Sequence, residues 1–267
     1  MALLTIDQVI AALATAFRMR FFKATATSKG AGFWHSLWKV AGKPAAGATP
    51  ATGNGAIPTD ATTGASAFTN PTAGAKTYLE KLVALATVVG VVQLYDRLWA
   101  NSGLSGTSVA LQSFTQPALT RHTTGAGNEI WLEVYTAFGA TGTTFTVKYT
   151  NQAGLAAQTA TLAYADGAPV AGQMIGPFPL ASGDTGVQKI ESVQLSGSTL
   201  TAGDFGAVLL HPHAAASIPV AGQPAQLDVL QTGHQEIVDD ACLGLMVLCS
   251  TTSTGIVHLT DVVLAQG

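Results

Sequence analysis

The sequence predicts a mainly β fold: an antiparallel β-sandwich of jelly-roll-like type, preceded by a short α-helix and an extended Gly- and Ala-rich amino-terminal arm. After residue 105, short stretches with strand patterns alternate with turn residues. Residues 28–75 carry Gly and Pro at spacings that suit neither helix nor strand. Only 10% of the 267 residues are charged and 48% are hydrophobic, whereas soluble domains average about 25% charged. The chain must therefore bury much of its surface or share it with partners.

The first predicted element is a helix near the amino terminus. Thr5 and Gln8 fit a capping box, and apolar residues follow at three- and four-residue spacing, which predicts a helix reaching Phe22. Because the next fifty residues offer little to pack against, we expect this apolar face to dock on the rest of the chain, a second copy or a foreign surface. The face comprises Ile6, Ile10, Leu13, Phe17 and Phe21.

Residues 1–75 are predicted to form this helix and an arm that can be removed from a sandwich domain spanning 76–267. Long structureless segments are usually linkers or binding segments. In the arm, Trp34 and Trp38 would share one face of a helical turn, as would Phe33 and Leu37. Such rings are typical of interface hot spots, although they could instead fold back onto their own domain.

Charge divides the chain into two parts. Residues 1–97 hold nine Lys or Arg and four Asp or Glu, a net charge of +5, while the remainder holds three and eleven, a net charge of −8. The basic residues form no run of five, which favours an acidic protein surface over nucleic acid as the partner. The predicted partner-contact residues are Phe17, Arg18, Arg20, Phe21, Phe22, Phe33, Trp34, Leu37, Trp38, Lys39 and Lys43.

The sandwich domain begins with a predicted helix over Lys76 to Thr87, followed by a strand from about Val91 to Trp99, although one continuous helix to Leu98 is also compatible with the pattern. Residues 144–150 alternate apolar and polar side chains, and Asn151 to Gly154 supply the turn of a hairpin. Further strands are predicted at 109–114, 130–138, 155–164, 187–195, 205–211, 225–230, 243–249 and 256–264.

No motif typical of an enzyme occurs in the sequence, and we expect no catalytic residue, metal or cofactor. His211 and His213 could share a cation, but the spacing identifies no third ligand. The carboxylates at 236, 239 and 240 are better explained as a solvated sheet edge than as a calcium site. Cys242 and Cys249 lie seven residues apart, on opposite faces of a strand, so we expect free thiols. We also expect neither a secretory signal nor a membrane span.

Three segments resemble a family of tailed-bacteriophage virion proteins encoded near the major capsid protein. They are Tyr95-Asp96-Arg97-Leu98-Trp99-Ala100-Asn101-Ser102-Gly103-Leu104, Tyr149-Thr150-Asn151-Gln152-Ala153-Gly154 and Pro179-Leu180-Ala181-Ser182-Gly183-Asp184-Thr185-Gly186-Val187. The resemblance covers about residues 90–210, and its motifs are structural turns and strands.

The resemblance implies a capsid-associated structural protein, a decoration or cement protein on the outer surface of the virion. Its expected partners are the major capsid protein and further copies of itself, as a homotrimer, with no membrane and no nucleic acid. Two alternatives belong to other classes: a head-fibre or tail module that binds a host glycan, and a metal-dependent hydrolase using His211 and His213. After residue 140 there is no Trp on which a sugar could stack, which favours the cement protein.

Overall fold

The computed structural model describes residues 3 and 5–267 and confirms a mainly β, antiparallel fold with one short helix near the amino terminus. The elements are α1 (Ile6–Leu13), β1 (Phe17–Ala24), β2 (Trp34–Ser36), β3 (Gly42–Lys43), β4 (Thr77–Ala86), β5 (Gly90–Ala100), β6 (Gln112–Ser113), β7 (Glu129–Thr136), β8 (Thr143–Asn151), β9 (Gln158–Tyr164), β10 (Gln173–Ile175), β11 (Val187–Leu195), β12 (Asp204–Ile218), β13 (Ala225–Leu227), α2 (Val229–Thr232), β14 (Glu236–Ile237), β15 (Leu243–Cys249) and β16 (Val257–Gln266).

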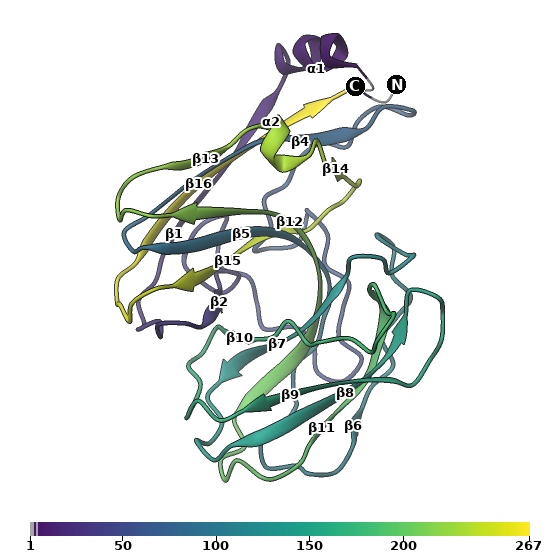
Figure 1. Ribbon diagram of the computed structural model, residues 1–267, viewed down its shortest axis with the longest axis vertical. Helices are drawn as coiled ribbons and strands as arrows, with labels where there is room; N and C mark the ends of the chain where they lie inside the picture. The colour runs from purple at the N-terminus through teal and green to yellow at the C-terminus, as the bar shows by residue number, and fades with distance from the viewer. Residues whose placement is uncertain (1–2, 4) are drawn as a thin grey trace.

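The strands form three sheets, and the middle one is closed. A six-stranded sheet has the order β13-β4-β16-β1-β3, with β14 also pairing with β4. A closed ring follows the order β10-β2-β15-β5-β12-β7, and a four-stranded sheet the order β6-β11-β8-β9. In Figure 1 the six-stranded sheet lies at the upper left and the four-stranded sheet at the bottom, with the long strand β12 running between the two lobes.

Each open sheet packs against the ring, which produces two sandwiches with separate cores. The upper core lies between the six-stranded sheet and β5, β12 and β15, and contains Phe21, Leu82 and Val247. The lower core lies between the four-stranded sheet and β5, β7 and β12, and contains Trp99 and Phe145. Because β5 and β12 supply residues to both cores, the two lobes share their longest strands.

The amino-terminal helix is shorter than predicted. The capping box is present, but α1 ends at Leu13, and the residues from Phe17 onward form β1. Met19 and Phe21 point into the core while Arg18, Arg20 and Phe22 point out. Phe17 and Phe21 are four residues apart, so they share one face of a helix and also one face of a strand. All eight residues of β1 pair with β16, which makes this segment a strand.

The helix predicted at Lys76 to Thr87 is wrong, because residues 77–86 form β4. Apolar residues occupy both faces of this strand, with Leu82 and Ala84 inside and Val83 and Leu85 half-buried outside. An apolar run of this kind satisfies either period, and pairing with β13 and β16 selects the strand. Val91 to Trp99 does form a strand, within β5.

The predicted boundary at residue 75 does not separate two units, because the segment before it is part of both the sheet and the ring. β1 pairs with β16 and β3, and β2 closes the ring by pairing with β10 and β15. Trp38 is 4% exposed and its indole Nε1 donates to the carbonyl of Ala48 (3.1 Å). Cβ atoms on Gly47 and Gly64 would lie within about 3 Å of the Trp38 ring, so these two glycines allow the arm to pack on it.

The motif at Tyr95 to Leu104 lies at the end of β5 and forms hydrogen bonds with the segment before residue 75. Trp99 Nε1 donates to the carbonyl of Asn54 (2.9 Å), and Asn101 Nδ2 donates to that of Gly53 (3.0 Å). Ser102 Oγ donates to the carbonyl of Pro50 (2.7 Å). The residues that carry the family resemblance therefore serve the fold.

The same motif supplies two buried ion pairs. Asp96 accepts two hydrogen bonds from Arg121, at 2.8 and 3.0 Å, and Arg97 pairs with Glu133. Cys242 and Cys249 are buried free thiols, as predicted. Within residues 3 and 5–267, no helix has the length and apolar character needed to cross a membrane.

Candidate interaction surface

The outer face of the six-stranded sheet can be assigned from the strand register, since paired residues point to the same side. The row across β1, β16 and β4 that includes Phe22 continues through Leu259 and Leu85. The two neighbouring rows are Arg20, Asp261 and Val83, then Arg18, Val263 and Lys81.

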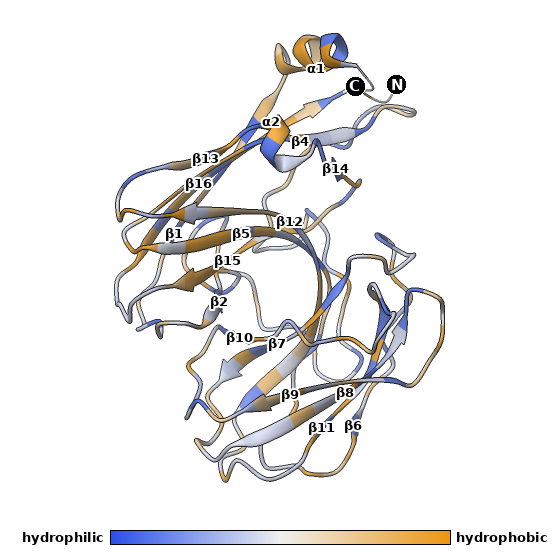
Figure 2. Ribbon diagram, viewed as in Figure 1, coloured by the Kyte–Doolittle hydropathy of each residue, from blue (hydrophilic) through white to orange (hydrophobic). Residues whose placement is uncertain are grey.

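Apolar side chains dominate this face, although it is not covered by another sheet. Phe22 is 44% exposed, and Val83, Leu85, Leu259 and Val263 are half-buried. The face of an antiparallel sheet that meets water is normally polar. Figure 2 shows the orange of apolar residues along these strands and α1. A contiguous apolar patch of this kind marks an interaction site.

Charged side chains lie among the apolar ones on this face, and most of them are basic. Arg20 donates to Asp261 at 2.8 and 3.0 Å, and Arg18 lies 3.4 Å from the same carboxylate. The hydrogen bond from Arg20 lowers the pKa of Asp261. Lys43 pairs with Phe22 in the register, and Lys81 with Val263. Four cations face one carboxylate, so these residues carry a net formal charge of +3 on a chain whose total is −3.

α1 extends this surface at one end of the sheet. Val9 and Ala12 pack on Tyr78 and Ala265, so the helix covers that end of the outer face. The opposite side of α1 is bare: Ile6 is 62% exposed, Ile10 60% and Leu13 43%. Leu230 of α2 is 83% exposed, and a hollow of about 300 Å³ lies between it and Ile6. We use "outer sheet face" for the strand residues and "helix face" for Ile6, Ile10 and Leu13.

The structure brings together four of the predicted contact residues. Arg18, Arg20, Phe22 and Lys43 lie on the outer sheet face. Phe17 is half-buried against the upper core, and Phe21 is 1% exposed within it. Phe21 is thus unavailable for a surface contact, because the alternation of β1 points it inward.

The aromatic cluster of the arm lies elsewhere. Residues 34–36 form a strand, so the helical pairing of Trp34 with Trp38 and of Phe33 with Leu37 is wrong. Leu37 is 1% exposed in the upper core, and Trp38 lies 5.0 Å from the guanidinium of Arg97. The Trp34 ring packs edge-on against that of Trp131 at 6.2 Å, and Phe33 is half-buried. These rings fold back onto their own chain, while Lys39 stays exposed.

Sequence reasoning missed the contribution of β4 and β16. Val83 and Leu85 lie in a segment that was predicted to be a helix. Leu259 and Val263 lie in a predicted strand that was assigned only to the core of the sandwich. A signal was present: residues 257–264 carry apolar side chains at both odd and even positions, which predicts a strand that is apolar on both faces.

The two histidines considered as metal ligands, His211 and His213, meet edge to face, and His122 stacks on His211. The rings of His122 and His211 are 3.7 Å apart, and those of His211 and His213 are 5.4 Å apart. Burial lowers the pKa of His211 to about 4 and that of His213 to about 3. His211 Nδ1 forms a hydrogen bond with Asn128 Oδ1, and His213 Nδ1 forms one with Gln235 Oε1. Throughout the described part of the chain, no three His, Cys, Asp or Glu side chains have the geometry to hold a metal ion.

No protein-family model matches the sequence, and no curated protein is significantly similar to it. Among solved structures, the infectious bursal disease virus VP2 subviral particle matches with 9% identity and a TM-score of 0.18, over 92% of this chain and 80% of that chain. The T=1 particles derived from infectious bursal virus match with 9% identity and a TM-score of 0.20, over 94% and 78%. Both neighbours are viral capsid proteins, but TM-scores of this size do not establish a common fold.

Proposed function

We propose that this protein is a structural component of a virion, an outer-capsid decoration or cement protein that binds a tailed-bacteriophage head through its outer sheet face. The observation that carries the proposal is the apolar and basic face of the six-stranded sheet, which, among residues 3 and 5–267, is covered only at the end where α1 packs. The resemblance of residues 95–104, 149–154 and 179–187 to phage virion proteins supplies the class of partner.

The chemistry of the outer sheet face favours an acidic protein shell. A face on which apolar side chains lie among mostly basic ones suits a partner that presents apolar side chains among carboxylates. Nucleic acid would use the charge of the basic residues, and a base would stack on Phe22. It would leave the aliphatic side chains without a matching contact, namely Val83, Leu85, Leu259 and Val263. The major capsid protein is the proposed partner, and the helix face is available to further copies of the chain in a homotrimer. This role requires no catalytic residue.

The glycan-binding alternative gains no support from the aromatic side chains of the carboxy-terminal half. Sugar recognition needs rings that are exposed for stacking. The candidate rings are all at most 4% exposed and lie in the lower core, namely Phe145, Tyr149, Tyr164, Phe178 and Phe205.

A paired substitution on the outer sheet face tests the proposal. Phe22→Ser with Leu259→Ser removes two neighbouring apolar contacts without entering the core. Because one interface hot spot costs about 2 kcal/mol or more, equivalent to about 30-fold in affinity, we expect at least that loss of binding. Binding is measured by quantitative co-sedimentation with heads of the encoding phage prepared without the protein.

The matched control is Leu155→Ser with Leu200→Ser, two exposed leucines outside the outer sheet face. The control should bind as the original protein does, and both variants should keep the original urea midpoint. Undiminished binding of the Phe22 and Leu259 variant would contradict the proposed role of this face.

A further inference from the structure

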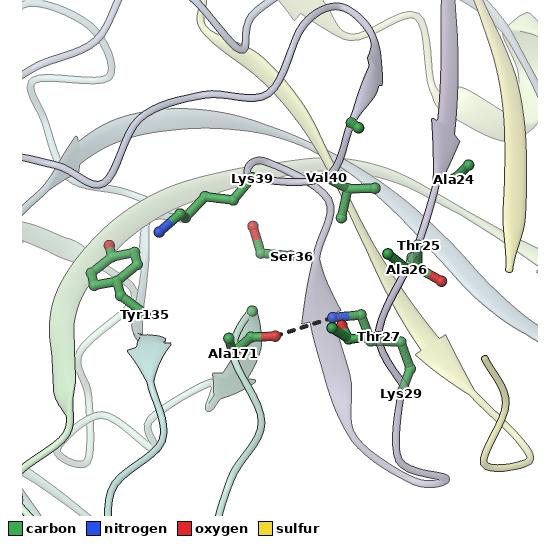
Figure 3. Close-up of a pocket in the computed structure, with 12 residues that line it drawn as sticks. Ala24, Thr25, Ala26, Thr27, Lys29, Ser36, Lys39, Val40, Tyr135 and Ala171 are labelled. Carbon is green, nitrogen blue, oxygen red and sulfur yellow. Dashed lines mark hydrogen bonds between the residues drawn. The ribbon is translucent and has the colours of Figure 1, made fainter. Parts of the chain in front are cut away.

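A cavity of about 340 Å³ lies where β1 ends and β2 begins to close the ring. Figure 3 shows Lys29 and Lys39 on opposite sides of it, with Ser36 between them. The ammonium of Lys29 is turned toward Ala171 and that of Lys39 toward the ring of Tyr135. Its mouth is formed by exposed residues, among them Ala24 and Ala26, so the cavity opens to solvent. The outer sheet face ends at this mouth, because Ala24 shares the parity of Phe22 along β1.

The cavity is cationic and has no acidic lining residue. Lys29 is 2% exposed, and its Nζ donates to the carbonyl of Ala171 (3.1 Å). Lys39 donates to Thr49, and its Nζ lies 5.3 Å from the centre of the Tyr135 ring. A third ammonium, that of Lys23, does not line the cavity but donates to the carbonyl of the lining residue Val40 (3.1 Å) and to that of Pro44 (2.6 Å).

Among the described residues, no acidic side chain lies close enough to Lys29 to form an ion pair with it. Cys249 and, to a smaller extent, Glu133 act to raise its pKa, but the Glu133 carboxylate is paired with Arg97. Burial, the largest effect, lowers the pKa of Lys29. The charge of Lys29 also contributes to the lowered pKa values of His35 and His258, whose main cause is burial. A buried ammonium with backbone acceptors alone is costly, and an anion beside it would offset that cost.

The walls restrict the kind of anion. Methyl groups of alanine, valine and threonine line most of the cavity, together with the hydroxyl-bearing residues Thr25, Thr27 and Ser36. The hydroxyl oxygens of Thr25 and Ser36 already accept hydrogen bonds from the amides of Ile256 (3.0 Å) and Trp38 (3.2 Å). A strongly hydrated inorganic phosphate would lose water against such walls. A short aliphatic chain ending in carboxylates would contact the methyl groups and place its oxygens at the two ammonium groups.

We infer that this cavity is a binding site for a short aliphatic carboxylate, held between Lys29 and Lys39. The carboxylate can come from a free small molecule or from an acidic side chain of a partner. The site is separate from the outer sheet face, and its existence does not depend on the proposed capsid role.

The test is calorimetric titration of the full chain with glutarate, with 1,5-pentanediol as the uncharged ligand of the same length and inorganic phosphate as the hydrated anion. We expect saturable one-site binding of glutarate, and neither of the others should compete. A heptapeptide of glutamates, titrated in parallel, distinguishes the two sources of the carboxylate. If the peptide binds and Lys39→Met weakens that binding, the site accepts side-chain carboxylates. If the peptide does not bind, the site is restricted to free small molecules.

Lys29→Met and Lys39→Met should each weaken glutarate binding about tenfold or more, because each removes a charge-assisted contact. Lys148→Met, an exposed lysine of β8, is the matched control and should change nothing. If Lys29→Met does not fold, the exposed Ala26→Leu variant, which narrows the mouth, should lower affinity equally. Equal binding of the diol or of phosphate, or full affinity in both Lys39→Met and Ala26→Leu, would overturn the assignment.

Discussion

Removal of residues 1–75 is expected to unfold the whole chain, rather than to release a folded sandwich. The deletion removes β1 and β3 from the six-stranded sheet, which exposes the edge of β16, and it opens the ring by removing β2. It also removes Phe21 and Trp38 from buried sites. Truncating one such aromatic side chain costs about 3–5 kcal/mol, so these two alone approach the total of about 5–15 kcal/mol that stabilises a domain.

A shorter deletion provides the control for this prediction. Removing residues 1–14 takes away α1 but leaves β1 and every strand of the ring. Circular dichroism of this variant should retain the β signal with a cooperative urea transition, whereas the 1–75 deletion should lose both. A cooperative β-rich product from the longer deletion would show that the arm is separable after all.

Acid is expected to destabilise the protein strongly between pH 6.5 and about 4. Five histidines have lowered pKa values because burial disfavours their charged form: His35, His122, His211, His213 and His258. His35 and His258 are 0% exposed, with pKa values of about 4 against an ordinary 6.5. For one group, that difference corresponds to about 3 kcal/mol.

The sign follows from proton binding. Between pH 6.5 and 4 the unfolded chain binds more protons at these histidines than the folded chain does, so stability falls as the pH falls through this window. Above pH 6.5 their contribution to stability is complete. Glu80 and Glu129 act in the opposite direction, because burial raises the pKa of each and the folded state takes up their protons first. Urea midpoints at pH 7.5 and pH 4.5 measure the net loss.

His258→Met should reduce this acid loss. Neither ring nitrogen of His258 has a hydrogen-bond partner in the described structure, and the side chain is fully buried. A methionine of similar size removes both the unpaired polar atoms and the proton-binding group, so stability at pH 7.5 should be at least unchanged. An acid loss of the original size in this variant would show that other groups control it.

The strand pattern was predictable from the sequence where one face of a strand is polar. β8 and β11 were predicted almost to the residue, because each is bounded by turns rich in Gly, Asn and Asp. β4 was mistaken for a helix because both of its faces are apolar, and a double-sided apolar run has no single period. The apolar outer face of β4, which made its strand pattern unrecognisable, is part of the candidate interaction surface.

The arm was misread for a different reason. Glycine and proline spacing correctly predicted little regular structure in residues 28–75, but irregular chain can still be tightly packed. Its anchors are long-range contacts that no local pattern contains, such as Trp99 with Asn54, more than forty residues apart. Of the predicted contact residues, Arg18, Arg20 and Phe22 share a surface because they alternate along the strand β1, and the pairing of β1 with β3 adds Lys43.

Imaging of assembled phage heads at residue resolution tests the central claim most directly, because it shows which face of the protein meets the shell. The account predicts that Phe22, Leu259 and Leu85 lie within van der Waals distance of the major capsid protein, with Arg18 and Lys43 near its carboxylates. A head on which this sheet face points to solvent, while the four-stranded sheet contacts the shell, would contradict the account.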